Sequence, residues 1–239
     1  MEKRLSVEQQ ISEVLNIYNK LKCNKIQKGT YRIYGELEFK VCSPEIIRGK
    51  YQIEIIVTKQ FPNKLPIVKE IAGDIPKDFH KNTDEILCLG VETEIKIFLQ
   101  NNPNLLRFIN SFVIPYFYSF KLWQKTGKVP FGERSHEIRG IVEYYKEYLL
   151  LNNIQSILNI LRYVCTISKI NQNHRCPCGS GKNINKCYHY SQIKDLVKIN
   201  VKDDYRYLYL YYKSIIKKQK NNILYPLTNA EFERIYKIK

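Results

Sequence analysis

The sequence predicts an α+β fold in which one N-terminal helix precedes a meander of antiparallel strands, and helices return after residue 88. Three observations predict it: apolar residues at helical spacing near the start, two stretches of alternating apolar and polar residues, and renewed helical spacing in the second half. At 239 residues, with 44% hydrophobic and 26% charged residues, the chain is long enough for one sizeable core and a second small module.

The first helix is expected over about residues 6 to 22. Ser6 and Gln9 are spaced as a capping box at its start. The apolar side of this helix contains Val7, Ile11, Val14, Leu15 and Tyr18.

Strands are expected next, in two segments where apolar and polar residues alternate. Residues 31–41 place Tyr31, Ile33, Leu37, Phe39 and Val41 on one face, and residues 50–57 do the same with Tyr51, Ile53, Ile55 and Val57. The run LPIVKEI predicts a further strand after a turn at Phe61-Pro62-Asn63. Together these segments predict an antiparallel meander.

Helices are expected again from residue 102. Asn102 supplies an N-cap and Pro103 a first-turn proline, while Pro115 breaks or kinks a helix that continues to Gly127. The buried side of this helix contains Leu105, Leu106, Phe108, Ile109, Phe112 and Val113. Further helices are expected near residues 134–151 and 153–170, in SQIKDLVKI, in the Tyr-rich DDYRYLYLYYKSIIKKQK and in NAEFERIYKI.

Composition limits the classes of protein and partner. The start has no basic-then-apolar leader, and no apolar run is long enough to span a bilayer, so we expect a soluble cytoplasmic protein without a membrane partner. Seven cysteines, an odd number, favour metal ligands and free thiols over a disulfide framework. The net charge of +16 is uneven, because residues 171–239 carry 14 Lys and Arg against 5 Asp and Glu. This basic tail suggests ribosome or nucleic-acid contact, although no recognised binding motif accompanies it.

A metal site is predicted by Cys176, Cys178, Cys187 and His189. Three thiolates and one imidazole are a complete tetrahedral set for Zn2+, so the zinc is expected to be structural and not catalytic. GSGK between the cysteines allows a tight turn whose amides can bond the thiolates. Unrelated buried cysteines are a poor alternative in such a polar segment, and His174 is the alternative fourth ligand.

This stretch resembles the SEC-C motif, whose usual form is C-x-C-G-S-G-K, a few basic residues, and then C followed by C or H. Tyr188 occupies the usual fourth-ligand position here, and the histidine follows one residue later. The resemblance covers about twenty residues. It implies a small zinc knuckle that binds partners, as in the tail of the preprotein translocase motor.

Cys88 lies in HKNTDEILCLG, residues 80 to 90. A small buried cysteine that ends a strand is one interpretation. A thiol at the edge of a polar loop, where a partner can reach it, is the other. No Asp/His pair is arranged as in a protease, where an imidazole would activate the sulfur.

Four segments read together, YQIEIIV, FPNKLP, IPKDFHKN and ILCLG, resemble the ubiquitin-conjugating enzymes. Phe61-Pro62 and Pro66 match the F-P-x-x-P-P loop, and His80-Lys81-Asn82 replaces His-Pro-Asn. Cys88 matches the active-site cysteine, and its short interval from Asn82 resembles bacterial members that read H-x-N-x-D-G-x-L-C-L, with Glu85 at the usual glycine. GERSHEIRGIVEYYKEYL also looks like their C-terminal helical region, so the resemblance covers residues 5 to 150.

The resemblance implies a transferase that holds the C-terminus of a ubiquitin-like modifier as a thioester on Cys88 and passes it to an amine. Transthiolation needs no adjacent base, which agrees with the missing His–Cys pair. Asn82 is carried over as the group that stabilises the oxyanion and orders the loop. His80 is expected to support the turn, with proton transfer as the alternative, and Asp84 to orient or deprotonate an incoming lysine. His136 either faces the site or caps and packs.

The expected domains are a conjugating-enzyme-like domain with a C-terminal helical extension at 1–170, the zinc knuckle at 171–190 and a basic helical tail at 191–239. Partners implied by the resemblance are a ubiquitin-like modifier or modified target and an activating enzyme encoded nearby, in a bacterial antiphage-defence operon. The alternative function is a non-catalytic scaffold of the same fold, whose knuckle and tail bind protein, ribosome or RNA.

Overall fold

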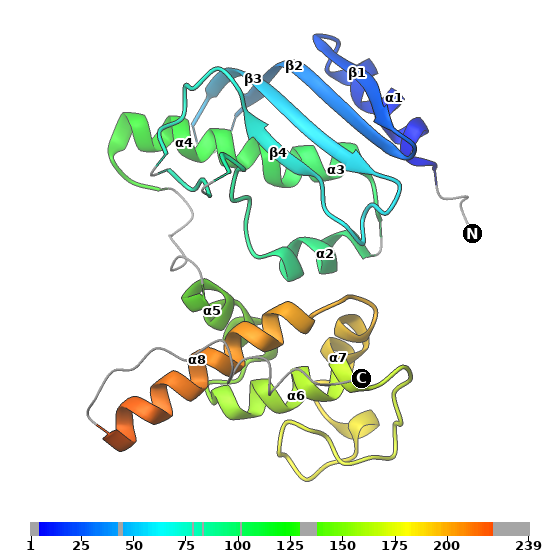
Figure 1. The fold of residues 1–239 in the computed structure, drawn as a ribbon, viewed down its shortest axis with the longest axis vertical. Coiled ribbons are helices and arrows are strands. Elements are labelled where there is room, and N and C mark those ends of the chain that lie inside the picture. Colours follow the sequence, from blue (N-terminus) through cyan, green and yellow to red (C-terminus); the bar gives the residue numbers. More distant parts are fainter. Residues whose placement is uncertain are drawn as a thin grey trace. The chain divides into compact units, whose positions relative to one another are not determined.

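The computed structural model describes residues 5–42, 45–77, 79–82, 84–100, 102–129 and 138–221, and of residues 218–221 it describes the backbone only. The chain divides into two compact units, residues 1–133 and 134–239. The α+β prediction is confirmed, because a four-stranded antiparallel sheet is combined with several helices (Figure 1). Among the described residues, none of the helices has the length and apolar character that a membrane span requires.

The sheet of the first unit is a simple meander with the order β1-β2-β3-β4, each strand antiparallel to the next. Its strands are β1 (Leu21–Gln27), β2 (Thr30–Val41), β3 (Ile47–Thr58) and β4 (Ile67–Glu70). The predicted alternation is confirmed in β2 and β3, where all buried residues lie on one face, while Val41 at the end of β2 is half-buried. Phe39 lies opposite Gly49, and a Cβ there would come within 2.5 Å of the Phe39 ring, so the glycine makes room for it.

Helices of the first unit cover one face of this sheet (Figure 1). They are α1 (Val7–Ile17), α3 (Leu105–Phe108), a π-helical turn (Ile109–Val113) and α4 (Ile114–Thr126), whereas α2 (Glu92–Gln100) lies farther from the sheet (Figure 1). Their aromatic side chains meet the strands, and the Tyr51 ring stacks on Phe117 with centroids 4.3 Å apart. Burial of this apolar face is the main stabilising contribution in the unit.

Three elements differ from the sequence-based expectation. The first helix ends at Ile17, and residues 21–27 form β1 at the edge of the sheet. Only Leu21 of this strand is buried, so its sequence lacks the alternation of apolar and polar residues that would predict a strand. Helix α2 was not expected, and the cap of the next helix is Asn104 in place of Asn102, since its side chain accepts the Arg107 N–H at 2.8 Å. Pro115 is the second residue of α4, which begins directly after the π turn, where the hydrogen-bond pattern already changes.

The second unit is a helical cluster. It contains α5 (Ile138–Leu149), α6 (Ile154–Thr166), a short 3-10 turn (Ile184–Lys186), α7 (Tyr190–Val197) and α8 (Lys202–Asn221). Helices α5 and α6, which the sequence attached to the first domain as an extension, share a core with α7 and α8. Tyr145 of α5 donates a hydrogen bond to Asp204 of α8 at 2.8 Å. The Tyr-rich stretch is helical, as expected, whereas His136 and NAEFERIYKI lie outside the described residues.

The junction of α1 with β2 predicts an acid-dependent stability. Glu8 accepts a hydrogen bond from the Tyr31 hydroxyl, which lowers the pKa of its carboxyl from 4.5 to about 2. A carboxylate with a lowered pKa stabilises the fold fully above its ordinary value and loses that contribution as the pH falls through the lowered one. Glu8→Gln should therefore lower the free energy of unfolding near neutral pH and flatten its decline below pH 4.5.

Urea unfolding at several pH values measures this effect. Tyr31→Phe removes the donor of the same hydrogen bond and should flatten the pH dependence in the same way. Parallel curves for the wild type and both variants would contradict the prediction.

Candidate functional sites: a cysteine loop and a metal centre

Cys88 is exposed at the end of the loop that follows β4. Its N–H donates to the His80 carbonyl at 2.7 Å, and Leu87 just before it donates to Val68 of β4 at 2.9 Å. Leu87 is buried, so the alternation of an extended chain turns the neighbouring Cys88 outward. The interpretation of Cys88 as a buried core residue is therefore wrong.

Asn82 organises the turn that precedes Cys88. Its Oδ1 accepts the backbone N–H of Asp84 at 3.0 Å and of Ile86 at 2.9 Å. Its own N–H donates to the Ile86 carbonyl at 3.0 Å. A short polar side chain that bonds backbone amides two and four residues ahead is a common way to close a tight turn. Because Oδ1 accepts both of these hydrogen bonds, the Nδ2 group of the side chain points away from the two backbone amides.

His80 and Asp84 belong to the same loop. His80 has φ of 43°, in the left-handed region, and its ring is edge-on to the Phe79 ring at 5.0 Å. Its carbonyl bonds Cys88, so the residue shapes the backbone around the thiol. Asp84 is exposed, and its N–H bonds Asn82. All four predicted residues thus lie in one exposed loop, which is attached to β4 by the hydrogen bond from Leu87 to Val68.

Tyr116 of α4 is a contributor that the sequence did not single out. Its hydroxyl donates to the Phe79 carbonyl at 2.9 Å, directly beside the loop. Burial raises its pKa, and the nearby Cys88 and Glu70 charges add to the rise. Tyr116 therefore stays a neutral hydrogen-bond donor below the loop. From the sequence it is one of many aromatic residues at helical spacing and carries no separate signal.

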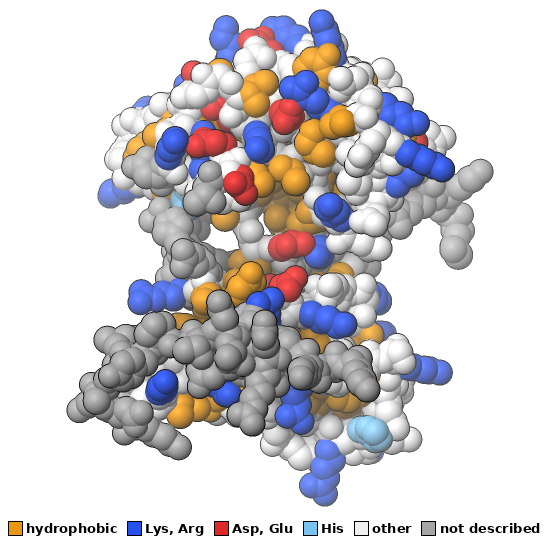
Figure 2. Space-filling view, in the orientation of Figure 1, with side chains coloured by type: hydrophobic (Ala, Val, Ile, Leu, Met, Phe, Trp, Pro, Cys, Tyr) orange, Lys and Arg blue, Asp and Glu red, His pale blue; other side chains and the backbone are white. Residues whose placement is uncertain are grey.

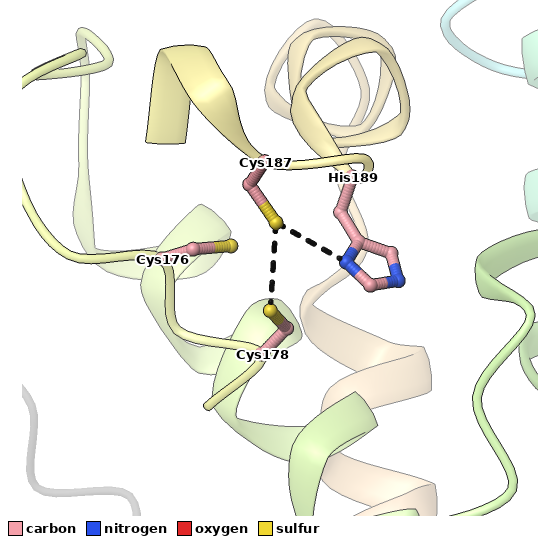
Figure 3. A group of neighbouring side chains, drawn as sticks. All are labelled: Cys176, Cys178, Cys187 and His189. Atoms are coloured by element: carbon pink, nitrogen blue, oxygen red, sulfur yellow. Dashed lines mark hydrogen bonds between the residues drawn. The ribbon is translucent and has the colours of Figure 1, made fainter. Parts of the chain in front are cut away.

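The second candidate site is the group of Cys176, Cys178, Cys187 and His189, which is positioned to bind a metal ion (Figure 3). All four side chains are buried, and their ligand atoms lie within 4.8 Å of one another. The Cys187 sulfur is 3.6 Å from that of Cys178 and 3.5 Å from His189 Nδ1. Zinc binds sulfur at about 2.3 Å, so tetrahedral ligands lie about 3.8 Å apart, and the donor set fits such an ion.

Local backbone structure holds the three cysteines. Cys176 donates its N–H to the Lys182 carbonyl at 2.8 Å, and Arg175 bridges Asn183, so the GSGK segment is a tight loop. Gly179 and Gly181 have φ of 89° and 73°, which glycine adopts without strain. The 3-10 turn then carries Cys187 back to the first two cysteines.

A hydrogen bond to a residue far away in the sequence orients the His189 ring. It is the N-cap residue of α7, and its Nε2 donates to the Leu149 carbonyl at the end of α5 at 2.8 Å. A hydrogen bond on one ring nitrogen leaves the other, Nδ1, as the metal-binding atom. The alternative ligand His174 is exposed and does not belong to the group.

The environment of Cys187 favours its thiolate. Burial raises the pKa of this thiol, but hydrogen bonds from the His189 amide and the Ser180 hydroxyl outweigh it and lower the pKa to about 6. Ser180 Oγ lies 3.6 Å from the sulfur. For Cys176, burial raises the pKa. Thiolates are the metal-binding form, so Cys187 is prepared for ligation and a cation would draw the proton from Cys176.

Comparisons of the chain with protein-family models, with curated proteins and with solved structures found no match. The candidate sites therefore rest on their own geometry and chemistry.

The metal centre predicts one zinc ion per chain, measured by elemental analysis of purified protein. Cys187→Ser and His189→Ala each remove one donor and should lower the zinc content to well below that of the wild type. His174→Ala is the matched control and should leave the zinc content unchanged. A loss of zinc in His174→Ala with retention in His189→Ala would assign the fourth ligand to the other histidine.

Metal removal should also loosen the second unit selectively. Because the four ligands join the loop, the 3-10 turn and α7, a chelator is expected to raise hydrogen exchange at amides such as Ile193, which bonds His189. Amides of β2 and β3 should keep their protection. Equal effects in both units would contradict this expectation.

Proposed function

We propose that the chain is an acyl transferase of the ubiquitin-conjugating type. Cys88 would carry the C-terminal carboxylate of a ubiquitin-like modifier as a thioester and pass it to an amine. The observation that carries the proposal is the exposed Cys88 thiol at the end of a braced polar loop that also holds Asn82. The α+β fold, with a helix before an antiparallel meander, agrees with the family that the sequence resembles.

Loading requires only an exchange between sulfurs. The Cys88 thiolate attacks the thioester carbonyl that joins the modifier to its activating enzyme. A new carbon–sulfur bond forms, and the activating enzyme's thiolate leaves, so the reaction consumes no proton and needs no base. A thiol that protrudes into solvent, as Cys88 does, suits such an exchange between two proteins.

Transfer to an amine places more demands on the loop. The amine nitrogen attacks the Cys88 thioester, a tetrahedral oxyanion forms, the amine loses a proton and the Cys88 thiolate leaves. Asn82 would donate from Nδ2 to the oxyanion, since its Oδ1 is held by two backbone amides. Exposed Asp84 would orient or deprotonate the amine, and His80 would support the turn through its carbonyl.

The metal centre is assigned a structural and partner-binding role. Protein side chains would fill all four coordination positions, which is typical of structural zinc. Tyr188 between two ligands is 67% exposed, which offers an aromatic contact beside the knuckle. We further propose that the protein acts in the bacterial cytoplasm. Its partner would be an activating enzyme encoded nearby in an antiphage-defence operon.

A scaffold function is the second candidate, and the charge distribution favours it. Residues 171–239 carry 14 Lys and Arg against 5 Asp and Glu, and basic side chains are spread over the drawn face of the second unit (Figure 2). In this case the knuckle and basic tail bind protein, ribosome or RNA without chemistry at Cys88. RNA retention that weakens with salt and survives Cys88→Ala, but not removal of residues 171–239, would favour the scaffold.

Cys88→Ser tests the transferase directly. The wild type, with ATP, the neighbouring activating enzyme and its modifier, should form an adduct that a thiol reductant releases. Cys88→Ser should instead form an oxyester that resists the reductant, because oxygen replaces the sulfur. Non-reducing and reducing gels with intact mass measurement distinguish the two adducts. A chain that forms neither adduct is not a conjugating enzyme.

Asn82→Asp separates loop structure from oxyanion stabilisation. The aspartate keeps an oxygen for the two backbone amides but has no donor for the oxyanion. We expect normal loading of Cys88 and a discharge to free lysine that is slower by about 10²-fold. Asn82→Ala loses both functions and should also raise hydrogen exchange at Ile86. Wild-type discharge rates in Asn82→Asp would exclude the oxyanion role.

A further inference from the structure

Lys81 lies between two predicted site residues and is almost wholly buried. Its side chain is only 3% exposed, which is rare for lysine unless its charge is paired. The residue follows His80 and precedes Asn82, in the exposed loop that carries Cys88. A buried ammonium group at this place requires compensation from neighbouring groups.

Two hydrogen-bond acceptors and one further carboxylate surround the Lys81 ammonium. Its Nζ donates to the Ile75 carbonyl at 2.9 Å and to Glu85 Oε2 at 3.2 Å. Glu70 Oε2 lies 3.9 Å away and is fully buried. The lysine therefore connects Glu70 at the end of β4, Ile75 in the segment after it and Glu85 farther along its own loop.

Glu70 gathers the segment that follows β4. Its carboxylate accepts backbone N–H bonds from Ala72 at 2.7 Å, Gly73 at 3.1 Å and Ile75 at 3.4 Å. A buried carboxylate with several amide donors and a nearby ammonium has its charge well compensated. The Glu70–Lys81 pair thus connects the segment after β4, whose amides bond Glu70, with the later part of the loop, which contains Lys81.

The backbone of Lys81 transmits this constraint to the candidate site. Lys81 forms an isolated antiparallel bridge with Leu87, the residue before Cys88, and Asn82 is its next neighbour. A movement of Lys81 would therefore shift the Asn82 turn and the Cys88 backbone together. No side chain other than Lys81 in the described part of the loop reaches Glu70, Ile75 and Glu85 at once.

We propose that Lys81, paired with buried Glu70, is a positioning residue that holds Asn82 and Cys88 in register with β4. The role concerns the loop itself, and its consequence for transfer rests on the proposed function. Without the ammonium, the Glu70 carboxylate would be buried without its cation and the loop would open locally.

Hydrogen exchange of Lys81→Met tests the positioning role without any assay of activity. Protection of the Asn82 and Cys88 amides, which bond Ile86 and His80, should fall by about tenfold or more. Protection in β2 and β3 should remain. Lys77→Met is the matched control, because Lys77 is 90% exposed and pairs with Glu85 at 3.7 Å, and it should change neither set.

A milder variant covers the case in which Lys81→Met does not fold. Glu85→Gln removes the negative charge of one partly exposed partner of Lys81 and should lower protection of the same two amides several-fold. Unchanged protection of Asn82 and Cys88, or an even loss throughout the first unit, would overturn the positioning role in either variant.

The conjugation assay then separates positioning from general stability. Lys81→Met should load Cys88 at the wild-type rate and discharge to lysine about tenfold more slowly, with a reduced kcat and an unchanged KM for the amine. Loading and discharge that both stay at wild-type rates would overturn the role in transfer. If the wild type forms no adduct at all, the proposed function fails, and the exchange result alone decides whether Lys81 holds the loop.

Discussion

Both candidate sites depend on buried polar groups. Burial of each group is possible because a hydrogen-bonding or oppositely charged partner lies within the chain. In the first unit, buried Glu70 bonds backbone amides and faces the Lys81 ammonium, and this pairing shapes the loop that presents Cys88. In the second unit, buried His189 bonds the Leu149 carbonyl and turns its other nitrogen toward the cysteines. Each pairing joins a loop to another part of its unit, so it orders a loop that is too polar to pack by itself.

The cysteine loop shows how the fold exposes a thiol. Leu87 is buried against β4, and the extended backbone then directs Cys88 to solvent. A hydrolase would need a base beside this thiol, but a carrier that exchanges one thioester for another does not. In the proposed transfer step the oxyanion would be stabilised by Asn82, whose orientation is set by the amides of Asp84 and Ile86.

The sequence predicted the elements that bury one face and failed where burial is slight. Strands β2 and β3 alternate cleanly because their inner side chains pack beneath the helices. Edge strand β1 buries only Leu21, so its first two residues were predicted as the end of the preceding helix and the others as no regular element. Asn102 and Asn104 both suit a helix cap, and only the hydrogen bond to Arg107 distinguishes the second. Cap position depends on this local geometry more than on residue type.

The sequence by itself determined the three cysteine donors of the metal site, because the spacing of Cys176, Cys178 and Cys187 around a glycine turn restricts them to a small loop. It also determined that a polar loop carries Cys88. Tertiary structure decided which histidine joins the metal donors, since the Leu149 carbonyl comes from a different helix. It also decided that Cys88 is exposed and Lys81 buried, because both depend on contacts with β4 and the segment after it that no local pattern encodes.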